Sequence, residues 1–181
     1  MTKRAYQKFE RNKRDFYRTP YKAVAPLLPF LKPNTRFHEP CAGDGTLIKH
    51  LEKSGHICTC AGDITPVAND NPFADCGIQL QDALNLKKCN GEMFITNPPW
   101  TRSILEPLIQ KFVELSPVTW LLFDADYMHL KRAIPMLKLC RRIVSVGRIS
   151  WFGGTTGFDN CAWYQFANSN DQPTEFYGKA A

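Results

Sequence analysis

Four consecutive residues, Asn97-Pro98-Pro99-Trp100, carry the clearest chemical signal in the sequence. They directly follow residues 93–96, an apolar run typical of a buried strand. An amino nitrogen conjugated with a ring is a poor nucleophile, and two oxygen acceptors would favour its tetrahedral form. We expect the Asn97 side-chain oxygen and the Pro98 carbonyl to be these acceptors, with Trp100 stacking on the ring. Such a tetrad arises by chance in roughly 1% or fewer of chains this long, so a turn without function is disfavoured.

A glycine-bearing turn, Glu39-Pro-Cys41-Ala-Gly43-Asp-Gly45, lies between an expected strand at 36–39 and an expected helix at 46–53. Glycines let the backbone approach a ligand closely, and a helix N-terminus offers free amide groups. A dinucleotide site would have a third glycine where this chain has Ile48. The turn therefore favours a ligand of adenosyl type without phosphates.

Two aspartates follow later expected strands. Asp63 comes after the second strand, where a carboxylate can accept hydrogen bonds from a ribose diol. Asp82 comes after the third, where it could accept from the amino group of an adenine ring. Each also has a simpler interpretation, Asp63 as a turn residue and Asp82 as a helix N-cap before Ala83.

The two motifs together resemble amino-group methyltransferases, especially the N(6)-adenine DNA enzymes. Glu39-Pro-x-x-Gly43-x-Gly45 is similar to their loop for S-adenosylmethionine, and Asn97-Pro98-Pro99-Trp100 is similar to their catalytic tetrad. The resemblance implies that residues of the tetrad are catalytic. It also implies that the cofactor is bound by Glu39, Cys41, Gly43, Gly45, Asp63 and Asp82, without a metal ion.

The resemblance extends to both sides of these motifs. Asp15-Phe-Tyr17-Arg-Thr19-Pro20 is similar to the segment that closes over the methionine end of the cofactor, so Tyr17, Thr19 and Pro20 are implied cofactor contacts. Residues 151–163 stand where these enzymes have a late hairpin. The resemblance covers about residues 15–166 of this chain. A separate target-recognition domain is not expected after the core. We therefore expect either that the loops at 64–77 and 151–160 recognise a very short site or that the enzyme has little sequence preference.

The remaining pattern alternates strand-like and helix-like runs. Further strands are expected at 57–61, 78–81, 93–96, 120–123, 142–146 and 161–166. Helices are expected at 21–31, from Ser103 with a capping box completed by Glu106, and at 127–139. The run at 120–123 has no polar interruption, which predicts burial on both faces of a parallel sheet. We therefore predict an α/β fold, a doubly wound, mostly parallel sheet of the Rossmann-like class I methyltransferase type that ends in an antiparallel hairpin.

Charge is unevenly distributed along the 181 residues. The net charge is +6, yet residues 1–36 hold ten Lys or Arg against Glu10 and Asp15, a balance of +8. A second group comprises Lys131, Arg132, Lys138, Arg141, Arg142 and Arg148. Clustered cations suit a polyanion, although a solvated tail and an ordinary helix face are equally compatible. We assign residues 1–14 to a basic arm, 15–170 to the methyltransferase domain and 171–181 to a C-terminal tail.

The seven cysteines include no Cys-x-x-Cys pair, so we expect reduced thiols and no zinc site. No apolar run approaches the ~20 residues needed to cross a bilayer, which predicts no membrane partner and a cytoplasmic location. The expected function is methylation of the exocyclic amino nitrogen of adenine in DNA. RNA adenine and protein glutamine amides are alternative acceptors, and a nucleic-acid-binding subunit without turnover is a further alternative.

Overall fold

The computed structural model describes residues 17–65, 77–151, 159–169 and 171–179. The basic arm at 1–14, Asp15, most of the loop at 65–77 and most of the loop at 151–160 lie outside these ranges. The elements, in chain order, are α1 (Tyr21–Val24), η2 (Ala25–Phe30), β1 (Arg36–Glu39), α2 (Thr46–Lys53), β2 (Ile57–Asp63), β3 (Ile78–Leu80), η3 (Ala83–Asn85), β4 (Met93–Thr96), α3 (Arg102–Leu115), β5 (Thr119–Asp124), η4 (Ala125–His129), η5 (Lys131–Ala133), α4 (Ile134–Leu137), β6 (Cys140–Ile149), β7 (Asp159–Phe166) and β8 (Glu175–Tyr177).

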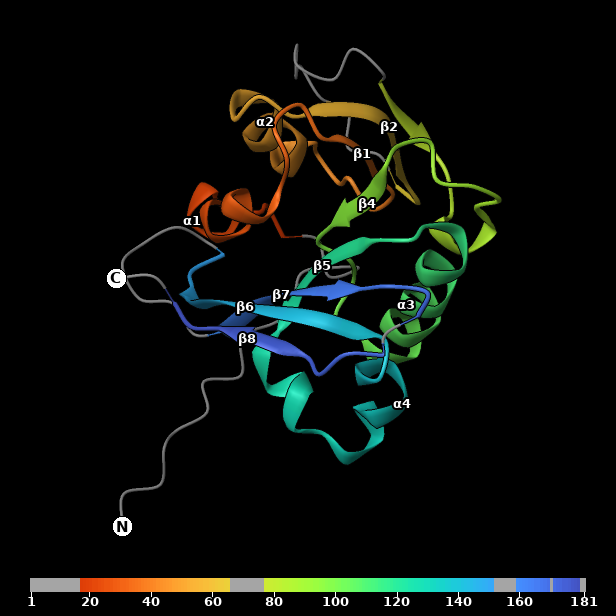
Figure 1. Ribbon diagram of the computed structural model, residues 1–181. Coiled ribbons are helices and arrows are strands. Elements are labelled where there is room, and N and C mark those ends of the chain that lie inside the picture. The colour runs from red at the N-terminus through yellow and green to blue at the C-terminus, as the bar shows by residue number, and fades with distance from the viewer. Residues whose placement is uncertain (1–16, 66–76, 152–158, 170, 180–181) are drawn as a thin grey trace.

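One eight-stranded sheet organises these elements, with the strand order β3-β2-β1-β4-β5-β7-β6-β8 (Figure 1). Strands β1 to β5 pair in parallel, and β7 pairs antiparallel with both β5 and β6. The strand order reverses between β1 and β4, which is the switch point where open α/β sheets bind ligands at the carboxyl ends of their strands. The predicted fold, with its closing antiparallel hairpin, is confirmed.

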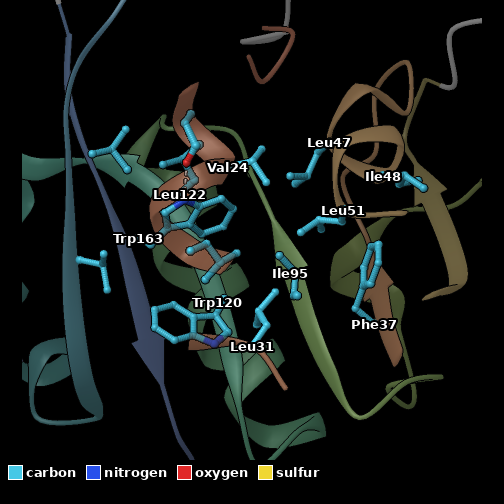
Figure 2. Close-up of a cluster of buried hydrophobic side chains, with 14 of the residues drawn as sticks. Val24, Leu31, Phe37, Leu47, Ile48, Leu51, Ile95, Trp120, Leu122 and Trp163 are labelled. Atoms are coloured by element: carbon cyan, nitrogen blue, oxygen red, sulfur yellow. Dashed lines mark hydrogen bonds between the residues drawn. The ribbon is translucent and has the colours of Figure 1, made fainter. Parts of the chain in front are cut away.

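Helices cover both faces of the sheet, and each layer has its own apolar cluster. On one face α1, η2 and α2 pack over Phe37, Ile95 and Trp120 (Figure 2). On the other face α3 and η4 pack over Phe94 and Phe123. Figure 1 shows α1 and α2 on one side of the sheet and α3 and α4 on the other. The arrangement is doubly wound.

Strand β5 lies at the centre of both clusters. Trp120 and Leu122 belong to the first cluster, whereas Leu121 and Phe123 belong to the second, and all four are fully buried. Alternate residues of a strand point to opposite faces, so an unbroken apolar strand is required where helices cover both. The sequence prediction for this strand is confirmed.

Helix α1 is joined to strand β7, in the antiparallel part of the sheet, by a buried hydrogen bond. The indole nitrogen of Trp163 on β7 donates a 2.7 Å hydrogen bond to the carbonyl of Ala23, 140 residues earlier. Both residues have no exposed surface. This bond fixes the segment that precedes β1, including Thr19, over the end of the sheet.

Three of the expected helices differ from the prediction. The run at 21–31 is α-helical only as far as Val24 and then continues as a 3-10 helix, because Pro26 and Pro29 cannot donate to a helical ladder. Helix α3 begins at Arg102 after Thr101, without a side-chain cap, so the capping box of Ser103 and Glu106 is wrong. Backbone bonds from residues 104 and 105 to the Thr101 carbonyl already start the helix two residues earlier.

The expected helix at 127–139 is also wrong as a continuous element. It consists of the 3-10 turns η4 and η5 and the four-residue α4. Leu130 is extended, with φ −86° and ψ 122°, which separates the two 3-10 turns. Pro135 lacks an N–H at the start of α4. Strand β8, which lies within the segment assigned as a tail, was not predicted and pairs parallel with β6.

Candidate cofactor and acceptor site

A cavity of about 960 Å³ opens at the carboxyl ends of β1, β2 and β4. Its lining includes nine of the thirteen residues predicted from the sequence, namely Tyr17, Thr19, Glu39, Cys41, Gly43, Asp63, Asp82, Asn97 and Pro99. The other four predicted residues, Pro20, Gly45, Pro98 and Trp100, stand beside the lining residues in the chain but do not contribute to it. The cavity therefore combines both motifs at the switch point of the sheet.

The glycine turn needs its two glycines for backbone conformation. Gly43 has φ 55° and Gly45 has φ 75°, values in the left-handed region that side chains disfavour. The Gly43 amide donates to Oδ2 of Asp63 at 2.7 Å, and the Ala42 amide donates to the Gly62 carbonyl at 2.9 Å. The end of β2 therefore holds the turn that follows β1.

Asp44 was missed by the sequence analysis although it organises this turn. Its Oδ1 accepts from the amide and the hydroxyl of Thr46, at 3.1 and 2.6 Å, and its Oδ2 accepts from Arg18 at 2.6 Å. Aspartates in turns often accept from the backbone amide two residues later, and this local signal could have identified Asp44. The Arg18 pair attaches the segment before α1 to the turn.

Asp63 and Asp82 both reach the cavity, and each also has a local partner. Asp63 uses Oδ2 for Gly43 and Oδ1 for the amide of Thr65, at 2.7 Å each. Asp82 is the N-cap of η3 and accepts from the Leu84 amide at 2.9 Å. A carboxylate offers about four lone-pair positions, so these bonds leave capacity for a ligand on both residues.

Glu39 is buried at the floor of the cavity. Burial raises the pKa of its carboxyl to about 8, while hydrogen bonds with the nearby Thr96 hydroxyl and the Cys41 amide lower that pKa by less, and the Asp63 charge raises it slightly. Its Oε1 accepts from the Cys41 amide at 3.1 Å. Oε2 of Glu39 and the Thr96 hydroxyl lie near each other, but within the described ranges neither atom has a partner at full hydrogen-bond geometry. Buried oxygens in this state are suited to a polar ligand group.

Cys41, next to Glu39, is partly buried, and it lines the cavity. Burial raises the pKa of this thiol well above its ordinary range, and the Glu39 and Asp63 charges raise it further. A thiol that stays protonated is a poor nucleophile. Cys41 contributes shape to the cavity rather than covalent chemistry.

Asn97 sits where β4 ends, and its side-chain amide has a partner at each end. Nδ2 donates to Oγ1 of Thr19 at 3.2 Å, and Oδ1 accepts from Nε1 of Trp100 at 3.0 Å. Pro99 lines the cavity and Pro98 is buried behind it. The sequence analysis identified these residues but predicted neither of the two hydrogen bonds.

Three aromatic rings meet next to Asn97. Trp151 lies edge-to-face against Trp100, with centroids 5.5 Å apart at 84°, and its ring is 5.8 Å from that of Tyr17. Such tilted pairs are the favoured geometry of aromatic contacts. Trp151, two residues after the end of β6, was expected only as part of a late hairpin.

The second basic group predicted from the sequence does not form one surface. Arg141 and Arg142 lie at the start of β6, whereas Arg148 lies near its end, about 20 Å further along the strand. Since β6 and β5 run in the same direction on either side of β7, the end of β6 is the one that faces the cavity edge. Arg148 is exposed there, and Arg142 pairs with Glu175 at the opposite edge.

The described residues contain no group of three or more His, Cys, Asp or Glu placed to hold a metal ion. Over the same residues, no helix has both the length and the apolar character to span a bilayer.

Comparison with solved structures identifies the fold. A provisionally assigned RNA methyltransferase from Pyrococcus horikoshii superposes with a TM-score of 0.67 at 16% identity, over 90% of this chain and 92% of that one. A type I restriction-modification methyltransferase subunit from Streptococcus thermophilus gives 0.59 at 10%, over 90% of this chain and 47% of that one. Magnesium protoporphyrin IX methyltransferase from Synechocystis, solved with bound S-adenosylmethionine, gives 0.56 at 15%, over 81% and 76%.

No protein-family model matches the sequence, and a comparison with curated proteins gives no match. The fold is that of the Rossmann-like class I methyltransferases, which use S-adenosylmethionine. These neighbours are named for acceptors as different as RNA and a tetrapyrrole. The acceptor must therefore be argued from the site of this chain.

Proposed function

We propose that this protein transfers a methyl group from S-adenosylmethionine to the exocyclic amino nitrogen of adenine in DNA. One observation carries the proposal: Asn97 and Pro99 line the same cavity as Gly43 and Asp63. The catalytic tetrad and the cofactor turn, more than fifty residues apart in sequence, therefore share one volume at the switch point of the fold.

The cavity suits S-adenosylmethionine in size and in polar groups. Asp63 has lone pairs for a ribose diol, and Asp82 has them for the adenine amino group. Ile64 and Leu84 add apolar walls for a planar ring. The buried Oε2 of Glu39 can accept from a donor of the methionine part. When bound, the cofactor supplies an electrophilic methyl group on a sulfonium sulfur, so the protein needs only to align the acceptor.

Asn97 and Pro98 would perform that alignment. Oδ1 of Asn97 and the Pro98 carbonyl accept the two hydrogens of the adenine amino group. These two hydrogen bonds favour a tetrahedral nitrogen, whose lone pair is no longer delocalised into the ring, and they stabilise the positive charge that develops on the nitrogen. The nitrogen then forms a bond to the methyl carbon as the carbon–sulfur bond breaks, and one amino proton leaves to solvent. Tyr17 and Trp100 supply aromatic surface for a base extruded from the duplex.

Charge supports a nucleic acid over a protein as the acceptor. Arg18, Arg102 and Arg148 are exposed at the cavity edge, although Asp126 and Asp159 share that edge. The excess of positive charge therefore comes mainly from residues 1–36, with a balance of +8. A segment of this charge is suited to contacts with phosphates, and its affinity for DNA should fall as salt rises.

Incubation of the full chain with methyl-labelled S-adenosylmethionine and separate DNA, RNA and protein pools tests the proposal. We expect label in DNA, released on hydrolysis as N(6)-methyladenine, and no label with the Asn97→Ala variant. Label in RNA or in glutamine side chains would show that the acceptor is not DNA, while the proposed amino-methyltransferase chemistry would still hold. Label in no pool, with cofactor binding intact, would favour a subunit without turnover.

A further inference from the structure

The side-chain amide of Asn97 is clamped by residues from two distant parts of the chain. Nδ2 lies 3.2 Å from Oγ1 of Thr19 and Oδ1 lies 3.0 Å from Nε1 of Trp100. Thr19 is 4% exposed, and Trp100 packs against both apolar clusters of the sheet. Both partners are therefore fixed by the fold, and the amide cannot turn about its terminal bond without losing two hydrogen bonds.

The Trp100 contact decides which end of the amide is the acceptor. An indole N–H can only donate, so the atom that faces it must be the amide oxygen. The amide nitrogen then faces Thr19, whose hydroxyl oxygen can accept. Because an amide oxygen has two lone pairs, the bond from Trp100 leaves one for an incoming donor.

The ring of Trp100 is held by a separate contact. Trp151 packs against it at 84° with centroids 5.5 Å apart. The N–H lies in the plane of the indole, whereas stacking uses its faces. Donation to Asn97 and stacking on a base are therefore independent properties of one side chain, and a substitution can remove the first without the second.

We propose that Trp100 is a positioning residue, which through its indole N–H holds the Asn97 amide with oxygen as the acceptor end. Thr19 completes this clamp from the other side. The catalytic consequence rests on the proposed function, because only an acceptor amino group needs that oxygen. The orientation of the amide does not rest on it and can be tested separately.

The sharpest kinetic test replaces Trp100 with 3-benzothienylalanine, a sulfur analogue of tryptophan that retains the ring shape and lacks the N–H. We expect kcat to fall about tenfold, as for the loss of one catalytic hydrogen bond, and KM for the acceptor to stay within about threefold. Trp100→Phe, which also retains an aromatic face, should behave in the same way. An analogue with wild-type kcat would overturn the inference and leave stacking as the function of the ring.

Thr19 offers a matched pair of substitutions for the other end of the amide. Thr19→Val retains the shape but removes the oxygen that accepts from Nδ2, whereas Thr19→Ser retains the oxygen. We expect a kcat loss of about five- to tenfold for Val and recovery to within about twofold for Ser. Equal losses in both variants would show that Thr19 acts by packing and would contradict the clamp.

A spectroscopic test needs no turnover. The Trp100 indole N–H signal, assigned by its absence from Trp100→Phe, should move in a ¹⁵N-edited NMR spectrum of Asn97→Ala, while the Trp120 signal stays in place. An unmoved Trp100 signal would overturn the inference even in an active enzyme. If the signal moves but the protein methylates no acceptor, the hydrogen bond between Trp100 and Asn97 is supported and the proposed function is refuted.

Discussion

The backbone amide of Gly43 donates a hydrogen bond of 2.7 Å to Oδ2 of Asp63. The bond joins the turn after β1 to the end of β2, so the residue proposed to bind the ribose also shapes the glycine turn proposed to bind the cofactor. A change at either position should therefore affect the same ligand.

Replacement of Asp63 by alanine should raise the Kd for S-adenosylmethionine by about 10- to 100-fold. The variant loses a charged acceptor for the ligand and leaves the Gly43 and Thr65 amides without their partner, and hydrogen bonds to charged groups contribute about 1.5–3 kcal/mol. Isothermal titration calorimetry measures the change. Asp171→Ala, at an exposed position by the start of β6, is the control. Wild-type affinity in Asp63→Ala would exclude this residue from the cofactor site.

Gly43→Leu should abolish cofactor binding. A leucine would be strained by the left-handed backbone, where φ is 55°, and its side chain would fill part of the cavity that Gly43 lines. Gly178→Ala is the control, because a Cβ there meets no atom within 4 Å and its φ is not positive. Calorimetry, with circular dichroism to check folding, distinguishes a lost site from a lost fold. A folded Gly43→Leu protein that still binds would contradict the assignment of this turn.

Asn97→Ala should lower kcat by about 10²- to 10³-fold while the Kd for S-adenosylmethionine stays within a few-fold. The substitution removes a preorganised acceptor for the developing charge, and removal of one such group typically has this effect. Single-turnover methylation and calorimetry measure the two quantities. Asn168→Ala, exposed after β7, should match the wild type in both. Parallel losses of turnover and cofactor affinity would instead show that Asn97 is structural.

Glu39 should make the free protein less stable as pH rises. Its pKa is about 8 in the folded state, against 4.5 when unfolded, so between these values the folded state binds a proton that the unfolded state has released. The contribution of Glu39 to the free energy of unfolding therefore falls from about pH 4.5 to pH 8 and is constant below this window.

Glu39→Gln, which is neutral at every pH, should remove this dependence. We expect the variant to be more stable than the wild type by a few kcal/mol at pH 8 and similar to it at pH 4. Urea unfolding without cofactor, at a series of pH values, gives both curves. Parallel pH profiles for the two proteins would show that the Glu39 carboxyl is ionised in the fold.

The sequence by itself determined the layer plan and the two chemical motifs. Alternation of short apolar and helical runs specifies a doubly wound sheet, and the unbroken run of β5 specifies burial on both faces, because local periodicity reports which faces a segment must cover. Gly43 and Gly45 were also identified from local sequence, since glycines in a turn between a strand and a helix let the backbone approach a ligand closely. Asn97 was identified because its neighbours form a rigid turn directly after a buried strand.

Tertiary structure alone decided how these residues meet. Thr19 reaches Asn97 across 78 positions because α1 is fastened to β7 by Trp163, and no local pattern encodes such a contact. The use of the Trp100 N–H by Asn97, the pairing of Arg142 with Glu175 and the addition of β8 depend likewise on the distant segments against which each residue packs. Local propensity specifies an element, whereas the packing of distant elements sets the partners of each side chain.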